Sequence, residues 1–186
     1  LKIVLFCLIF VLNLSVHASL PSVISAENLL THQKTTLSTK LTDKKGLVLI
    51  FMSAKCPCSD SHVPLIKKLA TTYKDFKFSV IHSNLDETRL ASEQYFKKAN
   101  FNFEVLEDSK TQIADLLGAY KTPHAFVFNP QGEILYQGGV TNSSNAANAD
   151  EFFLDNALSD ISKGQKVRTA EGRTLGCVIL RQSEIK

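Results

Sequence analysis

Hydrophobic and polar positions follow two regular patterns along most of the chain. An unbroken apolar run, Leu47–Phe51, has the length of a strand that is covered on both faces. Apolar residues then recur every three or four positions over 60–73, which predicts a helix that Pro64 should kink or terminate. The same patterns predict further strands at 76–82, 103–106, 125–128 and 133–136, and further helices at 86–99, before Gly118 and at 150–163. Alternating strands and helices followed by a hairpin and a helix indicate an α/β sandwich with a mixed sheet.

Polar segments separate these elements. The turn residues of 129–132, Asn-Pro-Gln-Gly, predict the hairpin between the last two strands. Residues 138–149 form a polar loop. Residues 19–45 are mostly polar, with scattered apolar residues. They should hold a short helix or edge strands that lead into a domain over 46–180.

Residues 1–18 have the pattern of a secretory signal peptide. A positive start at Lys2 precedes the apolar run Ile3–Leu12, and the small-x-small exit Val16-His17-Ala18 follows. The run is shorter than the roughly 20 apolar residues that a membrane span needs. We therefore expect cleavage and an exported protein, periplasmic or secreted, without a stable membrane span.

Charge and cysteine content narrow the range of expected functions and partners. The 186-residue chain has a net charge of +3 and no cluster of Lys and Arg with interleaved aromatic residues, so nucleic acid is not an expected partner. Beyond position 18 the sequence contains Cys56, Cys58 and Cys177. An exported compartment permits disulfides, and an odd number of cysteines leaves at least one thiol free or transiently paired.

The segment Cys56-Pro57-Cys58-Ser59 lies between the first apolar strand and the first helix. Unpaired N–H groups and the helix dipole favour a thiolate at this position, and a lowered pKa makes a cysteine nucleophilic near neutral pH. Cys58 could resolve a mixed disulfide on Cys56 by forming a strained disulfide ring that includes Pro57, or it could be a spare thiol. Cys177 could resolve such a mixed disulfide if the fold brings it near Cys56, or it could be an inert packing thiol.

Together, three segments resemble the thioredoxin fold, in the redoxin branch related to thiol-specific antioxidant and peroxiredoxin-like proteins. They are residues 51–59, 118–123 and 129–132, and the resemblance runs over 46–180. The segment 176–179, Gly-Cys-Val-Ile, resembles the tail of a redoxin subgroup. The resemblance implies a thioredoxin-like three-layer sandwich with a mixed central sheet.

The resemblance also implies roles for site residues. Cys56 corresponds to the attacking thiol, and the Thr122–Pro123 bond to the cis proline that lies against it. The backbone of Thr122 would then be free to pair with an extended thiol-bearing partner. Ser59 takes the place of the second cysteine of the usual motif, and Ser53 resembles the hydroxyl that orients peroxide in peroxiredoxins. We therefore expect Ser53, Ser59, Thr122 and Pro123 to contribute to substrate binding.

The leading hypothesis is an exported thiol-disulfide oxidoreductase with Cys56, Cys58 and Cys177 as its catalytic thiols. It would need no metal or organic cofactor, and its partners would be thiol- or disulfide-bearing proteins or small thiols.

Two alternatives remain open. A peroxidase is suggested by Ser53, although Leu49 and Pro123 stand where peroxiredoxins carry a proline and an arginine. A Cu(I)-binding thioredoxin-fold chaperone would use Cys56 and Cys58 with either His124 or His62.

Overall fold

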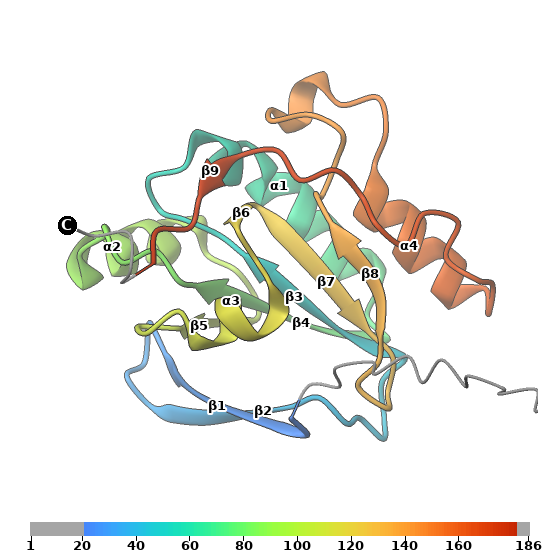
Figure 1. The fold of residues 1–186 in the computed structure, drawn as a ribbon, viewed down its shortest axis with the longest axis horizontal. Helices are drawn as coiled ribbons and strands as arrows, with labels where there is room; N and C mark the ends of the chain where they lie inside the picture. The colour runs from blue at the N-terminus through green and yellow to red at the C-terminus, as the bar shows by residue number, and fades with distance from the viewer. Residues whose placement is uncertain (1–20, 182–186) are drawn as a thin grey trace, which may run out of the picture.

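The computed structural model describes residues 21–181 (Figure 1). The predicted signal peptide, 1–18, lies outside the described residues. Within 21–181, none of the helices combines the length and the apolar character that crossing a membrane requires.

Seven strands form the main sheet, in the order β2-β1-β5-β4-β3-β7-β8. Their bounds are β1 Val23–Asn28, β2 Lys34–Ser38, β3 Gly46–Phe51, β4 Phe76–His82, β5 Glu104–Glu107, β7 His124–Phe128 and β8 Ile134–Gly138. A small second sheet pairs β6 Lys121–Thr122 with β9 Cys177–Val178. The helices are α1 Pro57–Thr72, α2 Arg89–Ala99, α3 Gln112–Leu117 and α4 Phe153–Ser162, with a 3-10 turn at Ala146–Asn148. Because β3 runs parallel to β4 but antiparallel to β7, the sheet is mixed, as predicted.

Helices cover both faces of this sheet. Every residue of β3 is buried, and its side chains alternate between two apolar clusters. Val48 and Ile50 pack with residues of α1, α2 and α4. Leu49 and Phe51 pack with residues of α3 on the other face. The result is the three-layer sandwich that the sequence predicts.

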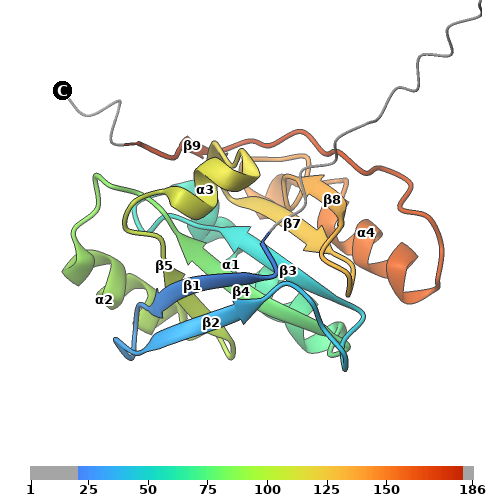
Figure 2. The ribbon, with the colours of Figure 1, turned by 60° about the horizontal axis from the view of Figure 1, so that its bottom comes forward.

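The segment before residue 46 extends the main sheet. β1 and β2 pair antiparallel and lie at one edge (Figure 2), where β1 joins β5 through Glu27 opposite Glu107 and Asn28 opposite Leu106. The lead-in therefore holds edge strands, one of the two expectations for it.

The first helix differs from its prediction at two points. α1 begins at Pro57, earlier than the periodic pattern near position 60 suggests, because a proline at the first helical position has no N–H that needs a partner. Pro64 does not terminate α1, which continues to Thr72. Ile66 and Leu69 are buried in the core beyond the proline, and this packing offsets the missing helical hydrogen bond.

Candidate functional site

Cys56 is the N-cap residue of α1. Its backbone is extended, with φ −83° and ψ 113°, and the residue is 2% exposed. Its Sγ donates a hydrogen bond to the carbonyl oxygen of Thr122 at 3.2 Å. The first N–H groups of a helix have no partner within the helix, and the helix dipole favours negative charge there. This position therefore stabilises a thiolate on Cys56.

The peptide bond between Thr122 and Pro123 is cis, as predicted. The backbone of Thr122 is not free for a partner, because it pairs with Cys177 in the ladder between β6 and β9 (Figure 1). Gly176 makes this approach sterically feasible. Its φ is +150°, and a Cβ at this residue would lie 1.8 Å from the carbonyl oxygen of Thr122.

These contacts bring the three cysteines of the described chain together. The Sγ atoms of Cys56, Cys58 and Cys177 lie within 4.8 Å of one another, and all three are free thiols. Cys56 is buried, whereas Cys58 and Cys177 are partly exposed. The cluster therefore combines one buried cysteine with two partly exposed ones.

The three thiols differ in how readily they ionise. Burial acts to raise the pKa of Cys56, but hydrogen bonds from Cys177 and from the backbone N–H of Ser59 help lower it to about 7. Burial and the hydrogen bond to Cys56 raise the pKa of Cys177 to about 12. Burial and the neighbouring charge of Cys56 also raise the pKa of Cys58. A thiolate therefore forms first on Cys56.

Ser53 and Ser59 hold the loop that precedes Cys56. The Ser59 hydroxyl oxygen accepts a hydrogen bond from the backbone N–H of Ser53 at 3.2 Å, and both residues are buried. The Ser53 hydroxyl donates to the carboxylate of Glu87, which also accepts from the N–H of Ala54 at 2.8 Å. Contact between these two hydroxyls and a substrate stays a prediction, because both are engaged inside the protein.

A buried ionic network, which no motif in the sequence predicted, lies behind this loop. His82 Nε2 lies 3.1 Å from Glu87, and His82 Nδ1 lies 3.1 Å from Glu107. Burial opposes the charged form of His82, but hydrogen bonds to Glu107 and Glu87 raise its pKa to about 9. Burial likewise opposes the charge on Glu87, yet the hydrogen bond with His82 lowers its pKa. The polar residues directly after the buried strand β4 were the feature of the sequence that could have indicated this network.

The two histidines considered as metal ligands lie outside the cysteine cluster. His62 is buried, with Nδ1 2.7 Å from the carbonyl oxygen of Cys58 and Nε2 2.9 Å from the hydroxyl of Thr141. His124 packs between Tyr120 and Phe126, and burial lowers its pKa to about 4. Within the described chain, the cluster of potential ligands contains cysteines alone.

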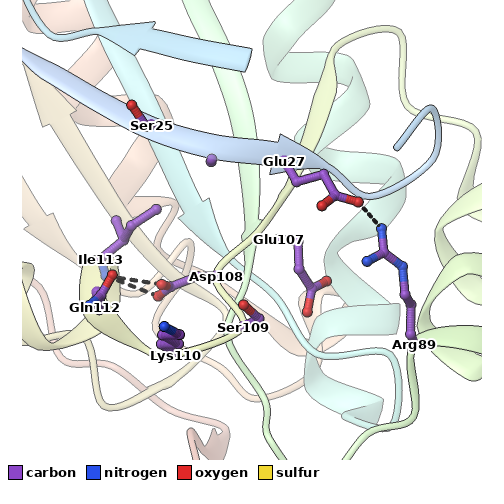
Figure 3. Close-up of a pocket in the computed structure, with 10 residues that line it drawn as sticks. Ser25, Glu27, Arg89, Glu107, Asp108, Ser109, Lys110, Gln112 and Ile113 are labelled. Atoms are coloured by element: carbon purple, nitrogen blue, oxygen red, sulfur yellow. Dashed lines mark hydrogen bonds and ion pairs between the residues drawn. The ribbon is translucent and has the colours of Figure 1, made fainter. Parts of the chain in front are cut away.

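A separate surface pocket of about 270 Å³ lies between β1 and the start of α3 (Figure 3). Its carboxylates are already paired: Glu27 with Arg89, Glu107 with His82, and Asp108 with backbone N–H groups of α3. The three cysteines do not line this pocket, so we centre the candidate site on the sulfur cluster.

The fold and the site define a thioredoxin-like protein with a cysteine at the start of its first helix and a cis proline beside it. A sequence model of the AhpC/TSA family matches residues 21–137. The chain therefore belongs to the AhpC/TSA family, and the predicted redoxin branch is confirmed.

Individual relatives are distant. The chain is 28% identical over 94 residues to the thiol-disulfide oxidoreductase ResA of Bacillus subtilis, covering 49% of this chain and 51% of that protein. The chain thus spans about half the length of the curated relatives that it matches. A hypothetical protein from Sinorhizobium meliloti superimposes with a TM-score of 0.77 at 22% identity, covering 91% of this chain and 97% of its own. A putative thiol:disulfide interchange protein DsbE from Chlorobium tepidum gives 0.58 at 19% identity, covering 78% and 94%. These two structures support the fold.

Proposed function

We propose that this protein is a thiol-disulfide oxidoreductase in which Cys56 attacks and Cys177 resolves. The observation that carries the proposal is the pairing of Cys177 with Thr122, which holds its sulfur within 4.8 Å of the Cys56 sulfur. Similarity to proteins named thiol-disulfide oxidoreductase supports the reaction class. The partners are thiol- or disulfide-bearing proteins or small thiols.

The reaction has two exchange steps. The Cys56 thiolate attacks one sulfur of a partner disulfide, forms a mixed disulfide and releases the other partner sulfur, which takes up a proton. Cys177 then loses its proton and attacks the Cys56 sulfur. A Cys56–Cys177 disulfide forms and the second partner sulfur leaves as a thiolate, so the partner gains two electrons. The reverse sequence oxidises a partner dithiol.

Cys177 suits the resolving role better than Cys58. The sulfurs of Cys56 and Cys58 also lie within 4.8 Å of each other, but Pro57 restricts the backbone change that a disulfide between them requires. A disulfide also requires sulfurs about 2.05 Å apart, so one of the segments must move. β9 is held to β6 through only two residue pairs, which lets it adjust more readily than the first turn of α1.

The proposal also includes an exported setting, periplasmic or secreted. It is supported by the signal-like pattern of residues 1–18 and by chemistry that needs a compartment in which disulfides persist. Fractionation of cells that express the full chain tests this part independently of the thiol chemistry. Recovery of uncleaved protein in the cytoplasm would contradict it.

Trapping of the mixed disulfide tests the assignment of roles. Each variant is reduced, mixed with glutathione disulfide and quenched with acid, and its cysteine pairs are mapped by mass spectrometry. Cys177→Ser should accumulate glutathione on Cys56, whereas Cys58→Ser should proceed to the Cys56–Cys177 disulfide. The opposite pattern would make Cys58 the resolving thiol. Exchange that persists in Cys56→Ser would reject the proposed nucleophile.

A further inference from the structure

We propose that Cys56, Cys58 and Cys177 of the reduced protein form a three-coordinate site for the soft monovalent cation Cu(I). The proposal rests on the triangle of sulfurs and does not require disulfide exchange. Its ligand set differs from the sequence-based alternative, because Cys177 takes the place that His124 or His62 was expected to fill.

The triangle is close to the size that a metal requires. Sulfurs within 4.8 Å of one another place a central ion at most about 2.8 Å from each. A metal–thiolate bond is about 2.3 Å, as for zinc, and corresponds to a triangle with sides of about 4.0 Å. At the 4.8 Å limit each sulfur would move inward by about half an ångström, which side-chain rotation can supply.

Two elements supply the ligands. Cys56 and Cys58 belong to the start of α1, where the helix dipole favours the negative charge that thiolate ligands bring. Cys177 belongs to β9, which is anchored beyond the site by the buried Ile179, whose N–H donates to the carbonyl oxygen of Tyr120 at 3.0 Å. Cys58 and Cys177 are partly exposed, so an ion would enter from their side of the cluster, while Cys56 is buried.

The donor set favours Cu(I) over zinc. Thiolates bind both the soft ion Cu(I) and the borderline ion Zn²⁺. Structural zinc takes four protein ligands in a tetrahedral arrangement. In the described part of the chain the cluster offers three sulfurs, and both ring nitrogens of the nearby His62 are already hydrogen-bonded. A three-coordinate ion fits this set without a further ligand.

Titration of the reduced full chain with Cu(I), under argon and in competition with bicinchoninate, tests the proposal. We expect one equivalent per chain and three sulfurs at about 2.3 Å by X-ray absorption. Replacement of any one of the three cysteines by serine should lower the affinity more than tenfold.

A variant that moves Cys177 without removing it distinguishes the effect of sulfur position from the effect of the number of thiols. Gly176→Ala keeps every cysteine but should displace β9 and weaken Cu(I) binding about as much as Cys177→Ser. Wild-type affinity in Cys177→Ser, or two sulfurs around the copper in the unmodified chain, would overturn the proposal. Four-coordinate zinc that Cu(I) does not displace would also overturn it. Circular dichroism of each variant checks folding, and glutathione exchange measured on the same samples shows whether the proposed function fails separately.

Discussion

Gly176 controls the distance between β9 and the first turn of α1. Its positive φ and its lack of a side chain allow the strand to pass the carbonyl oxygen of Thr122, to which the Cys56 thiol also donates. One glycine thus decides whether Cys177 belongs to the site.

Gly176→Ala should therefore slow closure of the Cys56–Cys177 disulfide by at least tenfold. The added Cβ would overlap the Thr122 carbonyl oxygen and push β9 away. The measurement is the rate at which the reduced protein loses two titratable thiols in a glutathione redox buffer.

Gly164→Ala is the matched control for this prediction. Gly164 also has a positive φ, +69°, but a Cβ there would meet no atom within 4 Å. Its replacement should affect stability by about 1 kcal/mol through backbone strain and leave closure unchanged. Equal closure rates in the two alanine variants would show that the position of β9 does not limit the reaction.

The loop between β3 and α1 depends on an element that follows it in the sequence. Glu87, just before α2, accepts hydrogen bonds from the Ser53 hydroxyl and the Ala54 N–H and pairs with His82 at the end of β4. The carboxylate thereby ties the loop to β4.

Glu87→Gln should lower the free energy of unfolding by about 3 kcal/mol. Removal of one partner from a buried ion pair leaves the other charge poorly compensated. Chemical denaturation measures the loss. The matched control is Glu93→Gln, which alters a partly exposed pair with Arg89 and should change stability by less than about 1 kcal/mol. Similar losses in the two variants would contradict a structural role for the buried network.

The same network predicts how stability depends on pH. The pKa of His82 rises from its usual 6.5 to about 9 on folding, so its contribution is fully present below 6.5 and is lost as pH rises through about 9. The pKa of Glu87 is lowered from 4.5, so its contribution is present above 4.5 and is lost as pH falls through the lowered value. The groups that face His82 are the carboxylates of Glu87 and Glu107 and the hydroxyl of Ser92.

The contribution of this network to the free energy of unfolding should therefore be greatest between about pH 4.5 and 6.5. His82→Gln should flatten the decline between pH 6.5 and 9. Denaturation curves of both proteins across this range measure the effect. A decline of the same slope in the variant would show that other groups cause it.

For the molecule as a whole, the groups near Cys56 support the proposed disulfide exchange rather than peroxide reduction. Cleavage of an O–O bond needs charge stabilisation on the departing oxygen. Pro123 has no N–H, the Ser53 hydroxyl donates to Glu87, and the ammonium group of Lys121 lies 5.7 Å from the centre of the Tyr120 ring. These groups are therefore not arranged around the Cys56 sulfur to supply that charge.

Hydrogen peroxide should consequently oxidise Cys56 at a rate within about tenfold of a free thiol with the same pKa. Stopped-flow measurements on the reduced protein, with Cys56→Ser as the control, test this expectation. A rate constant several orders of magnitude higher, abolished in Cys56→Ser and strongly reduced in Ser53→Ala, would identify the protein as a peroxidase.

Several elements could be predicted from the local pattern of side chains alone. The apolar run of β3, the hairpin of β7 and β8, and the helix end at Gly118 follow from side-chain periodicity and turn residues, and the structure confirms them. The place of Cys56 at a helix start was equally local, because it depends on a strand and a helix that meet within a few residues.

The groups that surround Cys56 could be identified only from the folded chain. Cys177 reaches the site through a two-residue ladder whose partner strand lies far earlier in the chain. The pairing of Glu87 with His82 and Ser53 likewise depends on how β3, β4 and the start of α2 pack together. Such contacts join segments distant in sequence, and their formation depends on the packing of the whole core rather than on any local pattern of residues.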